Sequence, residues 1–194
     1  DTSSWELGVP NGFSIKDSNN TAWVTKLDGD HSNNERSFID GPCFDFTNLT
    51  RPMIIMDVWA DMLEGSDGAA LQYSTNSGIT WETIGEIGDG INWYNRGSIS
   101  GNPGQQAINQ YGWSYQDSNW VEVRHDLDML IGEPQVRLRV AFGSDATSAN
   151  EGIAIDNIQI RERSRIALIE YFTNSSDANS KQDDDVIDNF IFKN

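Results

Sequence analysis

The sequence predicts an all-β fold: a two-sheet antiparallel β-sandwich of the jelly-roll type, followed by a short strand-helix extension. Residues 135–142 place apolar side chains at every second position, which is the period of a half-exposed antiparallel strand. Clusters of Gly, Asn, Asp and Ser recur between such segments, as expected for turns. Before residue 163, no stretch keeps the 3.6-residue period of an amphipathic helix. These three observations together favour a sandwich of antiparallel sheets.

The same criteria predict seven further strands. They span residues 22–27, 37–45, 53–59, 69–74, 81–87, 120–127 and 152–160. The polar segment 88–118 is too long to be a plain turn, and we expect it to fold over one mouth of the sandwich.

A tight hairpin is predicted at residues 74–81, Ser-Thr-Asn-Ser-Gly-Ile-Thr-Trp. The segment fits the Asp-box pattern (Ser-x-Asp-x-Gly-x-Thr-Trp) at every fixed position except one, where Asn76 replaces Asp. Gly78 can adopt the positive φ that such a turn requires, and Asn76 can bond back to the backbone. We expect Trp81 to pack over the turn. The motif stabilises hairpins of secreted β-proteins and carries no chemistry, so we interpret it as structural.

The composition is strongly acidic, with 13 basic and 30 acidic residues and a net charge of −17. This balance disfavours nucleic-acid binding and adsorption to anionic membranes. No apolar run approaches the ~20 residues of a membrane span, so we expect no direct membrane insertion. The single cysteine, Cys43, excludes an internal disulfide framework, and we expect it to be a small buried hydrophobe. Because the chain begins at Asp1 rather than Met, we expect it to belong to a longer polypeptide whose other domains are partners.

Three segments resemble the MAM-like jelly-roll domains of secreted, multidomain surface proteins of Bacteroidetes-type bacteria. Residues 152–160, Gly-Ile-Ala-Ile-Asp-Asn-Ile-Gln-Ile, resemble the closing strand of MAM-type domains, with the pattern Gly-x-Ile-Ala-Ile-Asp-Asp-Ile. Residues 5–12, followed by 22–29, are similar to the opening part of the same group, and residues 37–47 are similar to its second strand. The resemblance covers about residues 4–163 and implies an extracellular or cell-surface protein. The paired cysteines of animal MAM domains are missing here, so their cell-adhesion role does not transfer directly.

The resemblance also favours a structural Ca²⁺ ion near Asp156, which lies in an apolar strand. An ionised carboxylate buried there needs a cation or backbone amides to compensate its charge. The other candidate ligands are Asp28, Asp30, Glu35 and Asp67. Carboxylate oxygens suit a hard ion such as Ca²⁺. The alternative is that the Asp-Gly pairs are turn residues and that backbone amides satisfy Asp156.

The sequence predicts no catalytic residues. His31 and His125 lie in unrelated settings, and we expect His125 to be a solvated strand histidine. There is no Gly-x-Ser-x-Gly elbow, no Glu-x-Asp-x-x-Glu pattern of jelly-roll glucanases, and only one Asp box where sialidases have several. The alternative is that an acidic pair such as Asp126 and Asp128 reaches glycosidase spacing in the fold.

Aromatic residues in the long segment 88–118 are candidates for binding a sugar. Sugar sites on β-sandwiches stack exposed rings against a sugar face and bond its hydroxyls with polar side chains. The candidate ligand-binding residues are Trp93, Tyr94, Arg96 and Trp113, with Tyr111 and Tyr115 nearby. The alternative is that these rings cover the end of the core.

The character of the chain changes after Arg163. Residues 166–174 are predicted to form a buried strand and 183–191 a helix. This unit resembles the start of a thioredoxin-like domain without its redox cysteines. We therefore expect a MAM-like domain at 1–163 and an extension, or the start of a further domain, at 164–194.

Together these features predict a non-catalytic, extracellular adhesion or ligand-binding module, stabilised by calcium, within a larger surface or secreted protein. Its expected partners are a glycan or a cell-surface protein. The alternative is an accessory domain of a secreted protease or glycosidase whose catalytic part is absent from this chain.

Overall fold

The described residues form a β-sandwich of nine strands. The computed structural model describes residues 4–12, 15 and 21–163. The strands are β1 (Glu6–Gly8), β2 (Ala22–Val24), β3 (Arg36–Phe44), β4 (Pro52–Asp61), β5 (Gly68–Ser74), β6 (Glu82–Thr83), β7 (Gln116–Asp126), β8 (Val136–Gly143) and β9 (Gly152–Glu162). Two short 3-10 helices, η1 (Pro103–Gln105) and η2 (Asp128–Leu130), lie in the loops. The strand and helix predicted for 164–194 lie outside the described residues.

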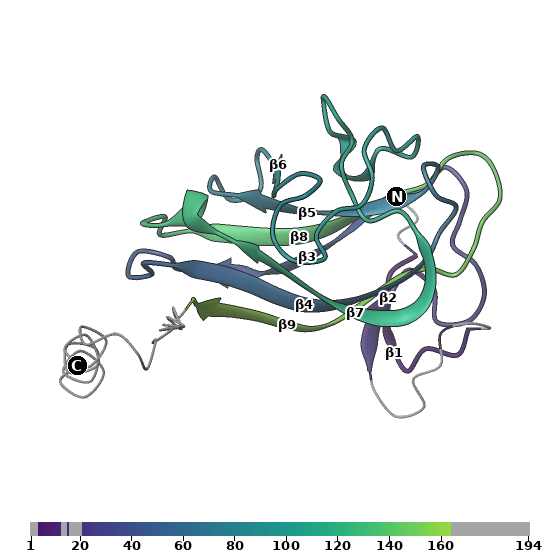
Figure 1. Cartoon of the computed structure of the whole chain (residues 1–194), viewed down its shortest axis with the longest axis horizontal. Helices are drawn as coiled ribbons and strands as arrows, with labels where there is room; N and C mark the ends of the chain where they lie inside the picture. Colours follow the sequence, from purple (N-terminus) through teal and green to yellow (C-terminus); the bar gives the residue numbers. More distant parts are fainter. Residues whose placement is uncertain (1–3, 13–14, 16–20, 164–194) are drawn as a thin grey trace, which may run out of the picture. The chain divides into compact units, whose positions relative to one another are not determined.

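The strands pair into two antiparallel sheets with the order β1-β2-β9-β4-β7 and β3-β8-β5-β6. From β2 to β9 the chain changes sheet at every step except at the β5–β6 hairpin, which is the connectivity of a jelly roll. Figure 1 shows the two layers, with β3, β5 and β8 in one and β4, β7 and β9 in the other. The predicted fold class is therefore confirmed.

Alternating apolar residues of both sheets form the core between them. On β4, Ile54, Met56 and Val58 are almost fully buried, while the residues between them are half-buried on the outer face. Val136 and Leu138 supply the same alternation from β8 on the opposite sheet. Each such side chain contributes about 1.5–3 kcal/mol to stability when it is buried. The two-residue period in the sequence thus corresponds to the two faces of each sheet.

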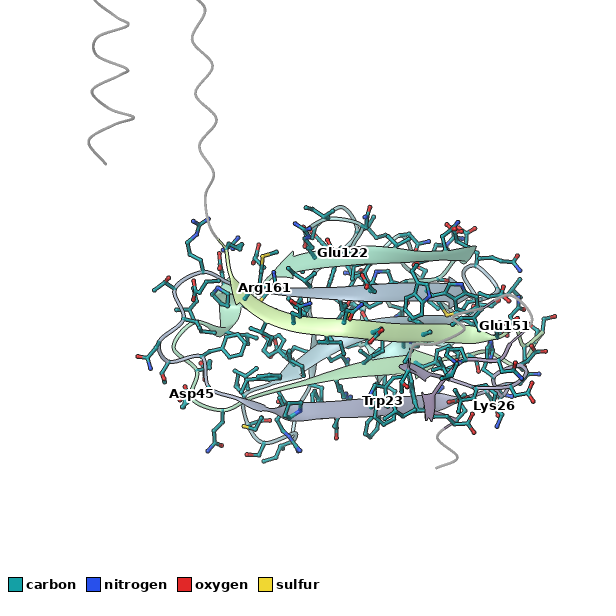
Figure 2. The ribbon with its side chains drawn as sticks, turned by 90° about the horizontal axis from the view of Figure 1, so that it is seen from below. Trp23, Lys26, Asp45, Glu122, Glu151 and Arg161 are labelled. Carbon is teal, nitrogen blue, oxygen red and sulfur yellow. The ribbon has the colours of Figure 1, made fainter. Side chains whose placement is uncertain are left out.

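The outer face of the five-stranded sheet is partly covered by apolar residues of its own. A second, smaller core joins Ile15, Ala22 and Val24 to Trp59 and Ala154. Figure 2 looks onto this side of the molecule, where Glu151 and Arg161 mark the two ends of β9. Among the described residues, no helix is long and apolar enough to cross a membrane.

The Asp-box hairpin between β5 and β6 forms the contacts that its sequence predicts. Asn76 Oδ1 accepts hydrogen bonds from the Ser74 hydroxyl at 2.8 Å and from the Thr80 backbone N–H at 2.9 Å. Gly78 has φ of 88°, and its carbonyl accepts a 3.1 Å hydrogen bond from Trp81 Nε1. Asn76 Oδ1 therefore takes the acceptor role of the Asp in the motif, and Asn76 Nδ2 also donates a 2.7 Å hydrogen bond to the Thr80 hydroxyl.

Two local expectations were wrong. Cys43 is exposed, because a register shift between Asp40 and Cys43 interrupts the alternation of β3. The strand predicted at 81–87 is reduced to Glu82–Thr83, because the chain leaves the sheet before Gly85. Gly85 approaches the His125 ring so closely that an added Cβ would lie 2.4 Å from Nε2.

Candidate ligand-binding groove

The rings predicted to stack on a sugar lie in the core. Trp93, Tyr94 and Trp113 are at most 4% exposed, and their ring centroids lie 4.8–5.3 Å apart. The Tyr94 hydroxyl accepts a 2.9 Å hydrogen bond from the Leu71 N–H, and burial raises the pKa of Tyr94. The expectation that these rings are exposed is therefore wrong, and they cover the core as in the alternative interpretation. Arg96 is exposed and forms a 3.0 Å ion pair with Glu64.

The long segment between β6 and β7 creates a groove elsewhere, on the outer face of the four-stranded sheet. Figure 1 shows these teal loops on the side of β5 that faces away from β4 and β9. The groove has a volume of about 730 Å³. The hairpin side supplies Gln72, Trp81, Glu82 and Thr83, and the loop side supplies Glu86, Asp89, Gln105, Gln106, Ile108, Asn109 and Tyr111. Part of the segment predicted to cover one mouth of the sandwich thus lines this groove.

One close approach seats the loop on the sheet. Gln72 Nε2 donates a 3.1 Å hydrogen bond to the Gly104 carbonyl, and Gly104 has φ of 72°. A Cβ at this position would lie 2.3 Å from the Gln72 amide nitrogen. Glycine is therefore required both for the backbone conformation and for the contact.

The floor of the groove is fixed by a hydrogen-bonded stack. Gln72 is almost fully buried, and its Oε1 accepts a 2.9 Å hydrogen bond from Arg139 Nε. The Arg139 guanidinium lies 4.1 Å from the ring centroid of Trp81 and 4.6 Å from that of Phe38. Burial lowers the pKa of Arg139, and nearby Asp40 opposes this shift. Trp81 therefore both closes the Asp-box turn and presents a held ring to the groove.

Carboxylates line the groove around this floor. Asp89 Oδ2 accepts a 3.0 Å hydrogen bond from the Glu86 N–H. Burial, followed by the charge of Glu86 and then that of Asp89, raises the pKa of the Tyr111 hydroxyl. Glu82 accepts a 2.7 Å hydrogen bond from Tyr73, whose pKa is raised to about 12 by burial and by Glu82. The groove thus presents negative charge beside aromatic rings.

His125 lies beside Asp89, one of these carboxylates. It is 6% exposed, so the expectation of a solvated histidine was wrong. Its ring packs on Trp93 with a centroid distance of 4.8 Å, and Nε2 lies 3.7 Å from Asp89 Oδ2. Among the described residues, Nε2 has no hydrogen-bond partner.

The predicted calcium ligands are not brought together. Asp28 and Asp30 are exposed, whereas Glu35 and Asp67 are buried. Within the described ranges, no group of three or more His, Cys, Asp or Glu residues is arranged to hold a metal ion. The five residues therefore form no common site in this part of the chain, and calcium binding stays a prediction.

The expectation that the Asp156 carboxylate is buried within an apolar strand was also wrong, because its side chain is half-buried. A register shift between β4 and β9 lies here, and Asn157 has φ of 52°. The Asn157 N–H donates a 2.7 Å hydrogen bond to Asp156 Oδ1. This contact matches the alternative in which backbone amides satisfy the carboxylate.

Glu35 and Asp67 instead belong to a buried cluster with His31. Glu35 accepts hydrogen bonds from the hydroxyls of Ser4 and Ser37, both at 2.5 Å. His31 Nε2 and Asp67 Oδ2 are 3.4 Å apart, and both side chains are fully buried. Burial by itself lowers the pKa of His31, but Asp67, the Ser32 carbonyl and Glu35 outweigh it, so that the pKa is raised. In this cluster, called here the His31 cluster, both carboxylates have partners inside the protein.

The acidic pair considered for glycoside hydrolysis has a structural partner. Arg163 Nη2 contacts the Asp128 carboxylate, and Arg163 Nη1 lies 3.7 Å from Asp126 Oδ2. Both carboxylates thus hold the end of β9 against the chain that follows β7.

Comparisons with known proteins assign no family to the chain. No protein-family model matches it, and neither does any curated protein. The groove itself was missed in the sequence, because its lining comes from three separate parts of the chain, Gln72, residues 81–89 and residues 104–111, which meet only through the seating of the loop. The only signal was the length of segment 88–118 and its density of Gln and Asn.

Proposed function

We propose that this chain is a non-catalytic ligand-binding module and that the groove over β5 and β6 binds a glycan. The observation that carries the proposal is one groove in which the rings of Trp81 and Tyr111 lie among amide and hydroxyl side chains. Its volume falls within the range of about 300–1,000 Å³ that is typical of small-molecule sites. Rings that stack on a sugar face, together with polar groups that bond hydroxyls, are the elements such a site needs.

The fixed floor supports this proposal. Gln72, Arg139 and Trp81 hold one another before any ligand arrives, so little side-chain freedom remains to be lost there. Gln105 and Asn109 are exposed at the loop side and can turn toward sugar hydroxyls. Binding therefore combines a rigid base with adaptable polar contacts.

The biological setting is part of the proposal. The MAM-like resemblance and the Asp-box hairpin support an extracellular or cell-surface module of a larger protein, with adhesion as its role. The net charge of −17 argues against nucleic acid as a partner. The same groove could serve an accessory domain that brings a secreted hydrolase to its polymer.

A glycan array followed by titration calorimetry on the full chain tests the proposal. We expect a bound oligosaccharide whose affinity falls about tenfold, equivalent to about 1.4 kcal/mol, in the double variant Gln105→Ala/Asn109→Ala. The matched control is Asn48→Ala, an exposed amide outside the groove, which should bind like the unmodified chain. No binding to any glycan, or equal affinity of the double variant, would contradict the proposal.

A further inference from the structure

The charge of the groove indicates more about its ligand. Of the described residues that line it, Glu82, Glu86 and Asp89 carry carboxylates, and none is Lys, Arg or His. All three are exposed, but Glu82 accepts a hydrogen bond from Tyr73, so Glu86 and Asp89 are the carboxylates left to a ligand. A concave site lined by one sign of charge focuses its field and concentrates ligands of the opposite sign.

Two of these carboxylates, those of Glu86 and Asp89, act on the hydroxyl of the same aromatic residue, Tyr111. Asp89 Oδ2 accepts the Glu86 N–H at 3.0 Å. A cation placed here would be attracted by both carboxylates, and the face of the Tyr111 ring can also attract a cation. Hydrogen bonds between charged groups are roughly twice as strong as neutral ones.

Behind Asp89 lies one histidine, at ion-pair distance but beyond hydrogen-bond distance. His125 is more than nine-tenths buried, and its unpartnered Nε2 lies 3.7 Å from Asp89 Oδ2, which is beyond hydrogen-bond distance. Arg139 is bound at the floor by Gln72 and by the Trp81 ring. Tyr111 hydrogen-bonds Glu86 but carries no positive charge, so no cationic side chain among the described lining residues neutralises these carboxylates.

We propose that the groove selects glycans that carry free amino groups, such as oligomers of an amino sugar. The ammonium group would bind between Glu86 and Asp89, with a neighbouring sugar ring on Trp81. This inference rests on the proposed glycan-binding function and specifies its ligand class. Neutral amides and hydroxyls on Gln105, Asn109 and Thr83 favour a polyhydroxylated ligand over a basic peptide, which would leave most of them without partners.

Calorimetry with three probes tests this proposal on the full chain at pH 6. The probes are a glucosamine hexamer, its fully N-acetylated counterpart and a lysine hexapeptide. We expect the glucosamine hexamer to bind at least about tenfold more tightly than either of the other two, with a preference that shrinks as salt is added. Equal affinity for the two hexamers would overturn the charge selection but leave glycan binding intact. Binding of the lysine peptide as tight as that of the glucosamine hexamer would overturn the assignment to glycans.

Charge-neutralising variants give the second test. Glu86→Gln and Asp89→Asn keep the size of each side chain, and the amide oxygen introduced by Asp89→Asn can still accept the Glu86 N–H. We expect each variant to lose most of the preference for the free amine, while the affinity for the N-acetylated hexamer changes less than about twofold. Asp30→Asn, at an exposed carboxylate outside the groove, is the matched control and should keep the preference. Variants that fold with an unchanged melting temperature and keep the full preference would refute the proposal.

Discussion

The His31 cluster and the acidic end of the groove both combine carboxylates with one histidine, but they differ in where the charges find partners. In the His31 cluster, Asp67 faces His31 at 3.4 Å inside the protein. In the groove, Glu86 and Asp89 face solvent, and His125 stands 3.7 Å behind them. The first arrangement uses its electrostatics to stabilise the fold, and the second leaves them accessible to a ligand. Substitutions in the two regions should therefore affect different properties.

The largest effect is expected from Asp67→Ala. The variant leaves His31 buried without its carboxylate and removes the acceptor of the Asp145 N–H at 3.0 Å. We expect the free energy of unfolding to fall by about 3 kcal/mol, the lower end for breaking a buried ion pair, because His31 can release its proton. Urea denaturation measures the change. Asp28→Ala, at an exposed position, should stay within about 0.5 kcal/mol, and a similar value for both variants would mean that the buried pair does not stabilise the fold.

The next largest effect is expected from Gly104→Ala, which tests whether the contact between the loop and β5 shapes the groove. In Gly104→Ala the added Cβ meets the Gln72 amide at 2.3 Å and φ is 72°. We expect a loss of about 1–2 kcal/mol in unfolding free energy from the backbone conformation alone, together with loss of glycan binding in the groove. Gly88→Ala is the matched control, since φ is 90° there but no atom lies within 4 Å of the added Cβ. Equal binding by both variants would show that the Gly104 contact does not shape the groove.

The sequence predicted more of the sheets than of the site, for a physical reason. Apolar alternation in segments such as 135–142 reflects the two faces of a strand, and the Asp box depends on contacts within eight residues. Both are local and can be recognised without knowing what lies opposite. The groove instead depends on Gln72 meeting Gly104, a contact over 32 positions that no periodicity encodes.

The errors at single residues have two causes. Cys43 follows a register shift in β3, which changes the face of the residues beyond it. Asp156 precedes the shift in β9 and lies by ordinary alternation on the same face as Ala154, opposite the core face of Ile153 and Ile155.

The aromatic residues of segment 88–118 were candidates either for stacking on a sugar or for covering the core, and the loop folds back so that Trp93 and Tyr94 reach the core. The strand order of the two sheets was not predicted, because alternation does not specify pairing.

A smaller, pH-dependent effect is expected in the His31 cluster only. The folded-state pKa of His31 is raised above its ordinary value of 6.5, so its contribution to stability is complete below pH 6.5 and is lost as the pH rises through the folded pKa. We expect the unfolding free energy to decrease over this interval, and a pKa that differs by one between the folded and unfolded states corresponds to about 1.4 kcal/mol. His31→Gln should remove this slope when unfolding is measured against pH, whereas His125→Gln should retain it. A slope that persists in His31→Gln would assign the dependence to another group.

The smallest effect is expected at Asp156, where calcium was predicted. The side chain is half-buried and accepts the Asn157 N–H through Oδ1, an interaction that the amide oxygen of Asp156→Asn preserves. We therefore expect this variant to lose less than about 0.5 kcal/mol of unfolding free energy. A bound ion would behave differently, because a ligand of the folded state adds RT ln(1 + [L]/Kd), or about 2.7 kcal/mol at a hundredfold excess. Thermal unfolding of both proteins in Ca²⁺ and in EGTA distinguishes the two cases. If EGTA lowers the melting temperature of the unmodified chain but leaves that of Asp156→Asn unchanged, Asp156 binds calcium and the backbone amide is not its main partner.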